Sequence, residues 1–310
     1  MNGIAFVFPG QGSQAVGMLK GYGDLPGIKE TLSEAGEALG REFVALLDEG
    51  PAEKLNQTVN TQPAMLTAGV AAYRAWCALG GPRPALVAGH SLGEYSALAA
   101  AGALAFRDAL PLVRFRAQAM QEAVPEGQGA MAAILGLDDG KVREGCAAAG
   151  GVVEAVNFNG PGQVVIAGEK AAVGRAIEEC KARGAKRAMA LPVSAPFHSS
   201  LLKAAGERLQ DYLRKVALSA PAIPLVNNVD VRVESAPDGI RQALVRQAYS
   251  PVRWVEVVNK LVELGATHIV ECGPGKVLAG LTRRIAPQTQ SLALADRTSL
   301  EEALSCLKAG

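Results

Sequence analysis

The segment 89–93, which reads Gly-His-Ser-Leu-Gly, constrains the fold of this chain more than any other. It fits the G-x-S-x-G nucleophile elbow. The apolar residues 84–88 before it predict a short buried strand, and residues 94–101 after it predict a helix. The motif requires this order of strand, sharp turn and helix, because the turn holds the serine hydroxyl clear of the sheet. Ser91 is therefore a candidate nucleophile for acyl chemistry.

The same residues allow a second interpretation. Ser91 and Glu94 also fit the S-x-x-E capping box, in which the serine is only the N-cap of an ordinary helix. Local sequence leaves both interpretations open, and the choice depends on whether the chain also supplies a base.

A serine nucleophile needs a general base, and the chain has three histidines. His90 is next to Ser91 in the elbow, where successive side chains diverge. His268 falls in a predicted buried strand, which favours a core histidine. His198 lies where the chain returns from a predicted small domain to a larger one, and clefts form at such junctions. His198 is therefore the candidate base.

Residues 1–125 and 196–310 predict a large domain in which short strands alternate with helices. Such alternation is typical of α/β layers around a parallel sheet, and we expect the domain to be α/β-hydrolase-like. Besides the elbow, the predicted elements are strands at 4–8 and 268–271 and helices at 28–49, 63–79, 107–124, 201–217, 241–249 and 255–264.

Residues 126–195 predict a small domain inserted into the large one. Turn residues at 125–129 precede strand 130–135, helix 138–149, strand 152–157, a turn at 159–162, strand 163–167, helix 169–183 and strand 188–193. This is βαββαβ, the ferredoxin-like order. Because it interrupts a larger α/β domain, the small domain should form one wall of a cleft.

The charge balance argues against nucleic acid as a partner. The chain has 31 Lys and Arg against 30 Asp and Glu, a net charge of +1, with no basic tract. No apolar run reaches membrane-spanning length, and the first strand starts without the basic region of a signal peptide. We therefore expect neither a nucleic-acid nor a membrane partner.

The cysteines predict a reducing compartment. They are five, an odd number, without C-x-x-C or metal-ligand spacing, which is typical of scattered reduced thiols. We expect a cytoplasmic protein with no metal, no disulfide and no cofactor.

A glycine-rich turn at 10–15 formally satisfies the G-x-G-x-x-G/A dinucleotide fingerprint. That fingerprint requires an acidic residue at the end of a second strand about twenty residues later, but Glu30 lies in a predicted helix. The other interpretation is that the turn presents a backbone N–H beside that of Leu92, and that the two form an oxyanion hole.

Two arginines, Arg114 and Arg116, lie in the predicted helix 107–124. Residues two apart point to different faces of a helix, so at most one of them reaches inward. An inward arginine would offer a bidentate site for a substrate carboxylate.

Taken together, these features resemble the malonyl-CoA:acyl carrier protein transacylases of dissociated bacterial fatty acid synthesis, over essentially the whole chain. Several separate motifs carry the resemblance, and they occur in the family's order. They are Pro-Gly-Gln-Gly-Ser-Gln at 9–14, Gly-His-Ser-Leu-Gly-Glu-Tyr at 89–95, Val-Arg-Phe-Arg-Ala-Gln-Ala-Met-Gln at 113–121, Asn-Phe-Asn-Gly-Pro-Gly-Gln at 157–163, Pro-Phe-His at 196–198 and Glu-Cys-Gly-Pro-Gly-Lys-Val-Leu at 271–278.

The resemblance implies a ping-pong transfer between two substrates, malonyl-CoA and acyl carrier protein. In such a transfer Ser91 attacks the malonyl thioester, His198 takes and returns the proton, and a malonyl-serine ester forms. The pantetheine thiol of the carrier protein then collects the acyl group. By the same resemblance, the backbone N–H groups of Gln11 and Leu92 hold the oxyanion.

The resemblance also implies the groups that bind and orient. Arg116 would hold the malonyl carboxylate, and main-chain carbonyl groups near Gln247 would orient the histidine, so no triad acid is expected. Phe197, beside the base, should crowd a branched acyl group and favour malonyl over methylmalonyl. Ala117 departs from the glycine found in many relatives, and we expect no functional consequence, because alanine is also small and compatible with a helix.

Three alternatives remain. An α/β-hydrolase esterase would share the elbow but needs a positioned acid, and the acids between the elbow and His198 fall largely in the predicted small domain. Asp138, Asp139, Glu144, Glu154 and Glu169 all lie there. A dinucleotide-binding module would lack its ribose-binding acid. An acyltransferase domain of a polyketide synthase is also possible, although the chain's first strand and last helix favour a free-standing protein.

Overall fold

A five-stranded parallel sheet forms the centre of the molecule in the computed structural model, which describes residues 3–193 and 195–308. The strand order is β7-β2-β1-β8-β9, and every neighbouring pair is parallel. The strands are β1 (Ile4–Phe8), β2 (Leu86–Gly89), β7 (Leu225–Val226), β8 (His268–Cys272) and β9 (Gln290–Leu294). Register pairs Phe8 with Gly89, so β1 and β2 end together at the elbow.

Helices cover both faces of this sheet, which explains why β1 is a continuous apolar run. Phe6 and Phe8 point into a core shared with the helices around α4, α5 and α6, whereas Ala5 and Val7 point into a second core shared with α11 and α12. The helices outside the smaller sheet are α1 (Ile28–Leu39), α2 (Arg41–Glu49), α3 (Ala52–Leu55), α4 (Thr58–Ala78), α5 (Gly93–Ala100), α6 (Phe106–Glu122), α9 (Lys203–Leu213), α10 (Pro237–Gln247), α11 (Trp254–Glu263), α12 (Val277–Ile285) and α13 (Arg297–Lys308), with 3-10 turns η1 (Lys20–Tyr22) and η2 (Ser200–Leu202).

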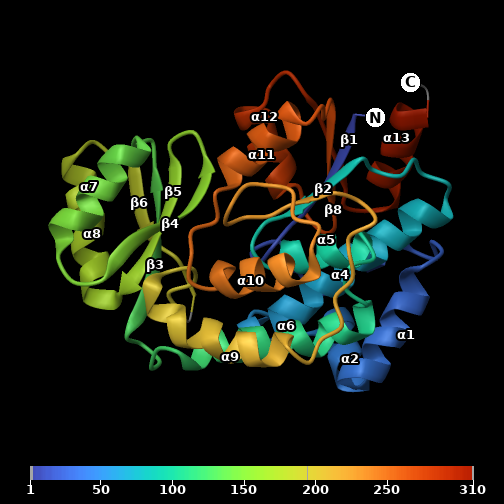
Figure 1. Cartoon of the computed structure of the whole chain (residues 1–310), viewed down its shortest axis with the longest axis horizontal. Coiled ribbons are helices and arrows are strands. Elements are labelled where there is room, and N and C mark those ends of the chain that lie inside the picture. The colour runs from blue at the N-terminus through green and yellow to red at the C-terminus, as the bar shows by residue number, and fades with distance from the viewer. Residues whose placement is uncertain (1–2, 194, 309–310) are drawn as a thin grey trace.

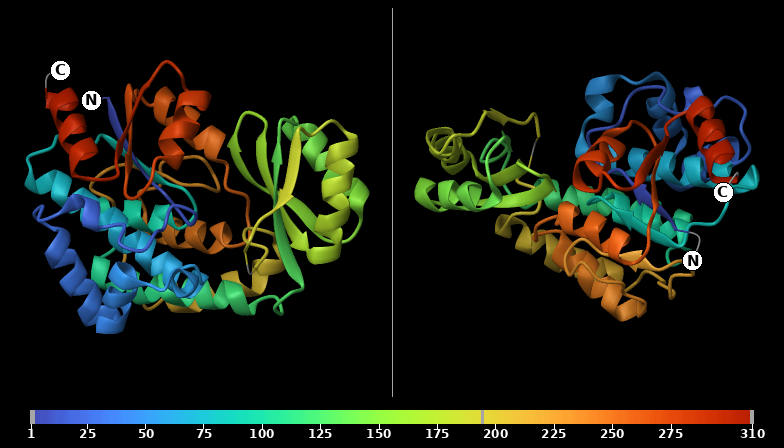
Figure 2. Two further views of the ribbon diagram at one scale, coloured as in Figure 1. Left: turned by 180° about the vertical axis from the view of Figure 1, so that it is seen from behind. Right: turned by 90° about the horizontal axis from the view of Figure 1, so that it is seen from above.

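A separate antiparallel sheet follows α6 and lies to one side of the parallel sheet (Figures 1 and 2). Its strand order is β4-β5-β3-β6, and α7 and α8 pack with it around their own apolar core. Its elements are β3 (Gly129–Leu135), α7 (Asp139–Ala149), β4 (Val153–Gly160), β5 (Gln163–Glu169), α8 (Lys170–Ala182) and β6 (Arg187–Ala190). The predicted order of strands and helices in this region is confirmed.

A short bridge between β4 and the segment before α11 connects the smaller sheet with the rest of the molecule. Val252, just before α11, forms a parallel bridge with β4: its N–H donates to the Val156 carbonyl at 2.8 Å, and its carbonyl accepts from the Phe158 N–H at 3.0 Å. These bonds fix the antiparallel sheet to the segment that connects α10 with α11. The smaller sheet is therefore held against the part of the chain that carries Gln247.

Several predicted boundaries were wrong. Helix α4 begins at Thr58 and not at Pro63, because the Thr58 hydroxyl accepts from Gln62 Nε2 at 3.0 Å within the first turn, and a proline near a helix start removes only one backbone bond. Strand β4 continues to Gly160, which shortens the predicted turn. Strands β7 and β9 and helix α13 were not predicted. Among the described helices none is long and apolar enough to cross a membrane.

Candidate active site

Ser91 occupies the turn between β2 and α5 in a left-handed backbone conformation, with a φ of 52°. The turn requires glycine on both sides. A Cβ on Gly89 would overlap the backbone of Gly93, and a Cβ on Gly93 would overlap the Phe8 carbonyl. No side-chain hydrogen bond caps α5, and the Glu94 carboxylate bonds elsewhere. The capping-box interpretation is therefore wrong, and the turn is a nucleophile elbow in shape.

The Ser91 hydroxyl lies 2.7 Å from Nε2 of His198. His198 follows the antiparallel sheet in sequence, is 3% exposed, and has a φ of 67°. Its Nδ1 lies 2.8 Å from the main-chain carbonyl oxygen of Gln247. Because a carbonyl oxygen can only accept, Nδ1 carries the proton and Nε2 presents a lone pair to the serine. The pair therefore has the geometry of a nucleophile and its base.

His198 is held in its neutral form. Burial, followed by the positive charge of Arg116, lowers the pKa of His198 from 6.5 to about 3. The hydrogen bond to the Gln247 carbonyl opposes this shift but is the weaker effect. A neutral imidazole at neutral pH is the form that a general base needs.

Lowering the pH from about 7 to about 5 is expected to destabilise the wild-type protein more than the His198→Gln variant. The unfolded imidazole takes up a proton near its usual pKa of 6.5, whereas the folded one stays neutral down to about 3. The stability that neutral His198 contributes is therefore complete above the unfolded pKa and decreases below it. Urea unfolding of both proteins across this range measures the effect, and identical pH dependence would contradict a buried neutral His198.

Arg116 points inward from α6 and is 2% exposed. Its Nη1 donates to Gln62 Oε1 at 2.6 Å, and its Nη2 donates to Gln247 Oε1 at 2.9 Å and to Ser91 Oγ at 3.2 Å. No ion pair joins Arg116 to a carboxylate within residues 3–193 and 195–308. A buried cation whose hydrogen bonds go to neutral groups favours an anionic ligand beside Ser91.

Arg114 faces the other way, as the helical spacing predicted. Its guanidinium lies over the Phe43 ring, 5.4 Å from the ring centroid, and the residue is only partly buried. Only one of the two arginines therefore reaches the serine.

Two further residues complete the site, Glu94 and Asn228, and neither was predicted to belong to it. Glu94 Oε2 accepts from Gln247 Nε2 at 2.8 Å and from the Asn228 N–H at 3.0 Å. Burial raises the pKa of Glu94 to about 7, while these hydrogen bonds and Arg116 oppose the shift. The Gln247 amide thus connects a buried cation and a buried carboxyl group. Asn228 follows the end of strand β7, which is a position where functional polar residues often lie.

The other two histidines do not contact Ser91 Oγ. His90 Nε2 lies 2.7 Å from Asn159 Oδ1, and its ring is 5.4 Å from that of Trp254. His268 lies at the start of β8 and is partly exposed, with Nδ1 2.9 Å from Thr267 Oγ1. The expectation that His268 is a core residue was wrong, because the first residue of β8 is not covered on all sides.

The remaining predicted site residues lie near the elbow. The turn that carries Gln11 abuts it, since a Cβ on Gly10 would overlap the His90 carbonyl, and the Gln11 side chain accepts from the Thr58 hydroxyl. Leu92 precedes α5, so its N–H lies at a helix N-terminus. Phe197 is buried in the main core next to His198. The roles of Gln11, Leu92 and Phe197 stay predictions.

The structure excludes the dinucleotide interpretation of residues 10–15. Glu30 lies in α1, and the next strand after β1 is β2, more than seventy residues later in the chain. A compact strand-helix-strand unit that could place an acid on a ribose is therefore missing from this part of the described chain.

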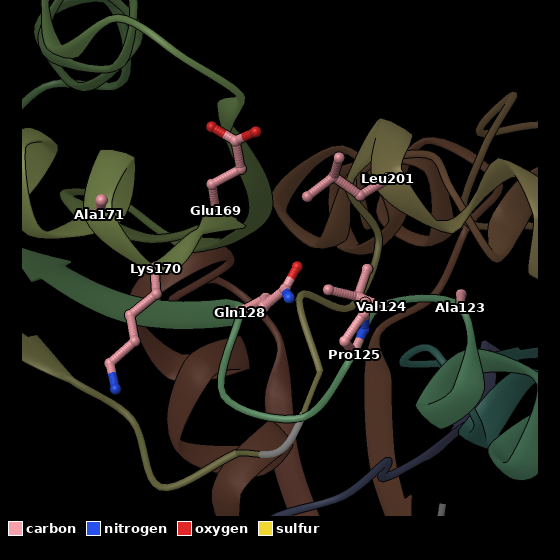
Figure 3. Close-up of a pocket in the computed structure, with 8 residues that line it drawn as sticks. All are labelled: Ala123, Val124, Pro125, Gln128, Glu169, Lys170, Ala171 and Leu201. Atoms are coloured by element: carbon pink, nitrogen blue, oxygen red, sulfur yellow. The ribbon is translucent and has the colours of Figure 1, made fainter.

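A cavity of about 670 Å³ lies at the junction between α6 and the antiparallel sheet (Figure 3). Residues from the loop after α6, the β5–α8 junction and η2 line it: Ala123, Val124, Pro125, Gln128, Glu169, Lys170, Ala171 and Leu201. None of the residues around Ser91 is among them. In the described part of the chain, no group of three or more His, Cys, Asp or Glu residues could hold a metal ion.

Comparison with known proteins supports an acyl-transfer site. A family model described as the acyl transferase domain matches residues 5–296. The malonyl CoA-acyl carrier protein transacylase of Escherichia coli K12 is 55% identical over 307 residues, which covers 98% of this chain and 99% of that protein. The transacylase of the same name from Bacillus subtilis is 45% identical and covers 99% and 98%.

Solved structures agree closely in fold. An acyl-carrier-protein S-malonyltransferase from Burkholderia pseudomallei has a TM-score of 0.96 at 62% identity and covers 97% of this chain and 99% of its own. A malonyl-transacylase solved in complex with a type II polyketide synthase acyl carrier protein has a TM-score of 0.96 at 50% identity and covers 98% and 99%.

Proposed function

The chain belongs to the acyl transferase family and is an acyltransferase, and from this premise we propose that it transfers malonyl groups from malonyl-CoA to the phosphopantetheine thiol of acyl carrier protein. The observation that carries the proposal is the 2.7 Å contact between Ser91 Oγ and His198 Nε2, beside a buried arginine that has no carboxylate partner in the described chain. The choice of the two substrates follows the names of the relatives and the solved complex of one of them with a carrier protein.

The reaction proceeds in two half-reactions through a malonyl ester on Ser91. His198 Nε2 takes the hydroxyl proton as Oγ attacks the thioester carbonyl, and the proton then passes to the departing CoA sulfur. In the second half-reaction the pantetheine thiol gives its proton to Nε2 and attacks the ester, and the proton returns to Ser91 Oγ. Main-chain atoms orient the base throughout, because His198 Nδ1 donates to the Gln247 carbonyl.

The oxyanion of each tetrahedral intermediate is held by the backbone N–H groups of Gln11 and Leu92. Their placement supports this role, since the Gln11 turn abuts the elbow and Leu92 lies at the start of α5. Phe197 limits the space beside His198 and favours malonyl over methylmalonyl.

The geometry favours transfer by Ser91 and His198 without a carboxylate triad. In the serine hydrolases that use a triad, a carboxylate accepts from Nδ1 of the histidine. Here the acceptor is the main-chain carbonyl of Gln247. The experiment that tests the proposed function supplies malonyl-CoA with holo-acyl carrier protein and measures malonyl-carrier protein against free malonate. We expect the malonylated carrier protein to be the main product. Free malonate as the main product would instead favour the α/β-hydrolase esterase.

The Arg116→Ala variant is expected to lose most malonyl transfer and to narrow the preference for malonyl-CoA over acetyl-CoA. An acetyl group leaves the buried guanidinium unpaired, and breaking a buried ion pair costs roughly 3–5 kcal/mol. Wild-type discrimination should therefore be about two to three orders of magnitude, since about 1.4 kcal/mol corresponds to tenfold.

Arg114→Ala is the matched control for Arg116→Ala, because Arg114 lies on the same helix and contacts Phe43 instead of the site. We expect it to keep both rate and preference. Competition between the two thioesters measures both variants. If Arg116→Ala keeps the wild-type preference for malonyl-CoA over acetyl-CoA, or if Arg114→Ala loses it, Arg116 does not select the carboxylate.

The two sheets also support a division into domains. We propose a large α/β-hydrolase-like domain from residues 1–125 and 196–310 and a small ferredoxin-like domain from residues 126–195, with the site in the large one beside their junction. The reaction as proposed needs no cofactor and no metal. A cytoplasmic location stays a prediction.

A further inference from the structure

The backbone of Ser91 is held in a conformation that a serine rarely adopts. A left-handed φ costs a residue with a Cβ conformational free energy, and it persists only where the surroundings fix it. The hydroxyl direction depends on this conformation, because Cβ is attached to the same Cα. The contacts of the Ser91 backbone therefore bear directly on the alignment of its Oγ with His198.

Two buried amide side chains hold that backbone, one at the Ser91 N–H and the other at the Ser91 carbonyl. Asn228 Oδ1 accepts from the Ser91 N–H at 2.8 Å, and Asn228 Nδ2 donates to the Gly89 carbonyl at 2.7 Å. Gln247 Nε2 donates to the Ser91 carbonyl at 3.0 Å. Both amides are fully buried, so loss of one of these bonds leaves a buried polar group without its partner.

One carboxyl oxygen in turn holds the side-chain amide of Gln247 and the backbone of Asn228. Glu94 Oε2 accepts from Gln247 Nε2 and from the Asn228 N–H, and Glu94 is 2% exposed. The bonds join α5 to residues 134 and 153 positions away in sequence, so they connect the helix after the elbow with the end of α10 and the segment after β7. Loss of the Glu94 side chain would leave two buried donors without their acceptor.

We propose that Glu94 is a positioning residue, which through Asn228 and Gln247 holds Ser91 in its left-handed conformation and keeps Oγ aligned with His198. The inference rests on the proposed function only in taking Ser91 as the nucleophile. This positioning requires an acceptor oxygen at the place of Glu94 Oε2, because Gln247 Nε2 and the Asn228 N–H both donate to that one atom. A glutamine at position 94 supplies an amide oxygen there, whereas an alanine supplies none.

The test measures how fast Ser91 reacts with a small neutral fluorophosphonate, a reagent that makes no use of the malonyl carboxylate. Glu94→Ala should lower the second-order rate constant by about ten- to a hundredfold, the loss typical of a nucleophile displaced by roughly 1 Å. Glu94→Gln should stay within about threefold of wild type, since it exchanges charged for neutral hydrogen bonds but keeps their geometry. Labelling of Glu94→Gln as slow as that of Glu94→Ala would contradict the acceptor argument.

The control is Thr31→Ala, which removes another fully buried hydrogen-bonding side chain far from the elbow. Thr31 Oγ1 donates to the Gly27 carbonyl at 2.6 Å and accepts from Arg74 Nη1 at 3.2 Å. This variant should have a lower melting temperature and an unchanged labelling rate, measured where all variants are folded. If Glu94→Ala behaves in the same way, Glu94 stabilises the fold and does not position the serine.

Asn228→Ala tests whether Glu94 acts on Ser91 through Asn228. The loss in Glu94→Ala combined with Asn228→Ala should be smaller than the product of the two single losses, because both act on the same bond to Ser91. A loss equal to the product would show that Glu94 does not act through Asn228. Should Glu94→Ala not fold, Glu94→Asp replaces it, since its carboxylate is one methylene short of both donors and should also slow labelling.

The same experiment separates the inference from the proposed function. If wild-type Ser91 reacts neither with the fluorophosphonate nor with malonyl-CoA, the proposed function fails. If wild-type Ser91 reacts with both and Glu94→Ala reacts at the wild-type rate, the proposed function stands and the positioning role of Glu94 is wrong.

Discussion

The Ser91→Ala variant is expected to lose malonyl transfer by a factor on the order of 10⁴ to 10⁶. Both half-reactions pass through an ester on Ser91, so without the hydroxyl no acyl-enzyme can form. The fold should remain, since the change removes one oxygen from a turn that is shaped by glycines and by Asn228 and Gln247. Transfer to holo-acyl carrier protein, followed by mass spectrometry of the carrier protein, measures the loss.

Ser96→Ala is the matched control, because Ser96 is a buried serine on α5 whose hydroxyl has no hydrogen-bond partner among the described residues. Its replacement should leave the rate near that of wild type. Substantial transfer by Ser91→Ala would mean that another residue carries the malonyl group or that no acyl-enzyme is needed.

The His198→Ala variant is expected to slow acylation by a factor of about 10² to 10⁴, the usual contribution of a positioned general base. The 2.7 Å contact with Ser91 Oγ and the neutral state of the imidazole give the physical reason. Stopped-flow measurement of CoA release in a single turnover isolates this step.

His268→Gln serves as the comparison for His198→Ala, since His268 lies at the start of β8 and its side chain bonds to Thr267 and not to the site. It should turn over near the wild-type rate. A wild-type rate of CoA release in His198→Ala would overturn the assignment of the base.

Sequence predicted that Ser91, His198 and Arg116 belong to one site, for different reasons, and the structure brings the three side chains together. Glycines at 89 and 93 encode the elbow, because no other residue allows the close backbone approach seen there. His198 followed by elimination among three histidines. Helix geometry predicted that at most one of Arg114 and Arg116 points inward, and the family resemblance chose Arg116. Only the elbow prediction depended on residues close together in the chain, whereas His198 and Arg116 needed the domain order and the family resemblance.

Sequence could not reveal how Glu94 is used, because its partners are distant in the chain. Asn228 follows a strand of two residues, Leu225–Val226, which is too short to show a periodic pattern. Glu94 was assigned only to a local capping box, whereas its carboxylate bonds across the core to Asn228 and Gln247. Long-range contacts of this kind depend on the tertiary fold and on no local preference.

Boundary errors had local causes. Pro63 marked a helix start in the sequence, yet the side chains of Thr58 and Gln62 stabilise an earlier turn. The expected turn at 159–162 contained two glycines, but pairing of Gly160 with Gln163 extends strand β4. A side-chain hydrogen bond in the first place and backbone pairing across the hairpin in the second outweighed the usual signal of a proline or a glycine.

The central claim is that a malonyl ester on Ser91 carries the acyl group. Brief mixing with malonyl-CoA, acid quenching, digestion and peptide mass spectrometry test it most directly. The account predicts one malonylated peptide, with the ester on Ser91, that disappears when holo-acyl carrier protein is added and malonyl-carrier protein appears. An adduct on another residue, or transfer to the carrier protein without any malonylated Ser91 peptide, would contradict it.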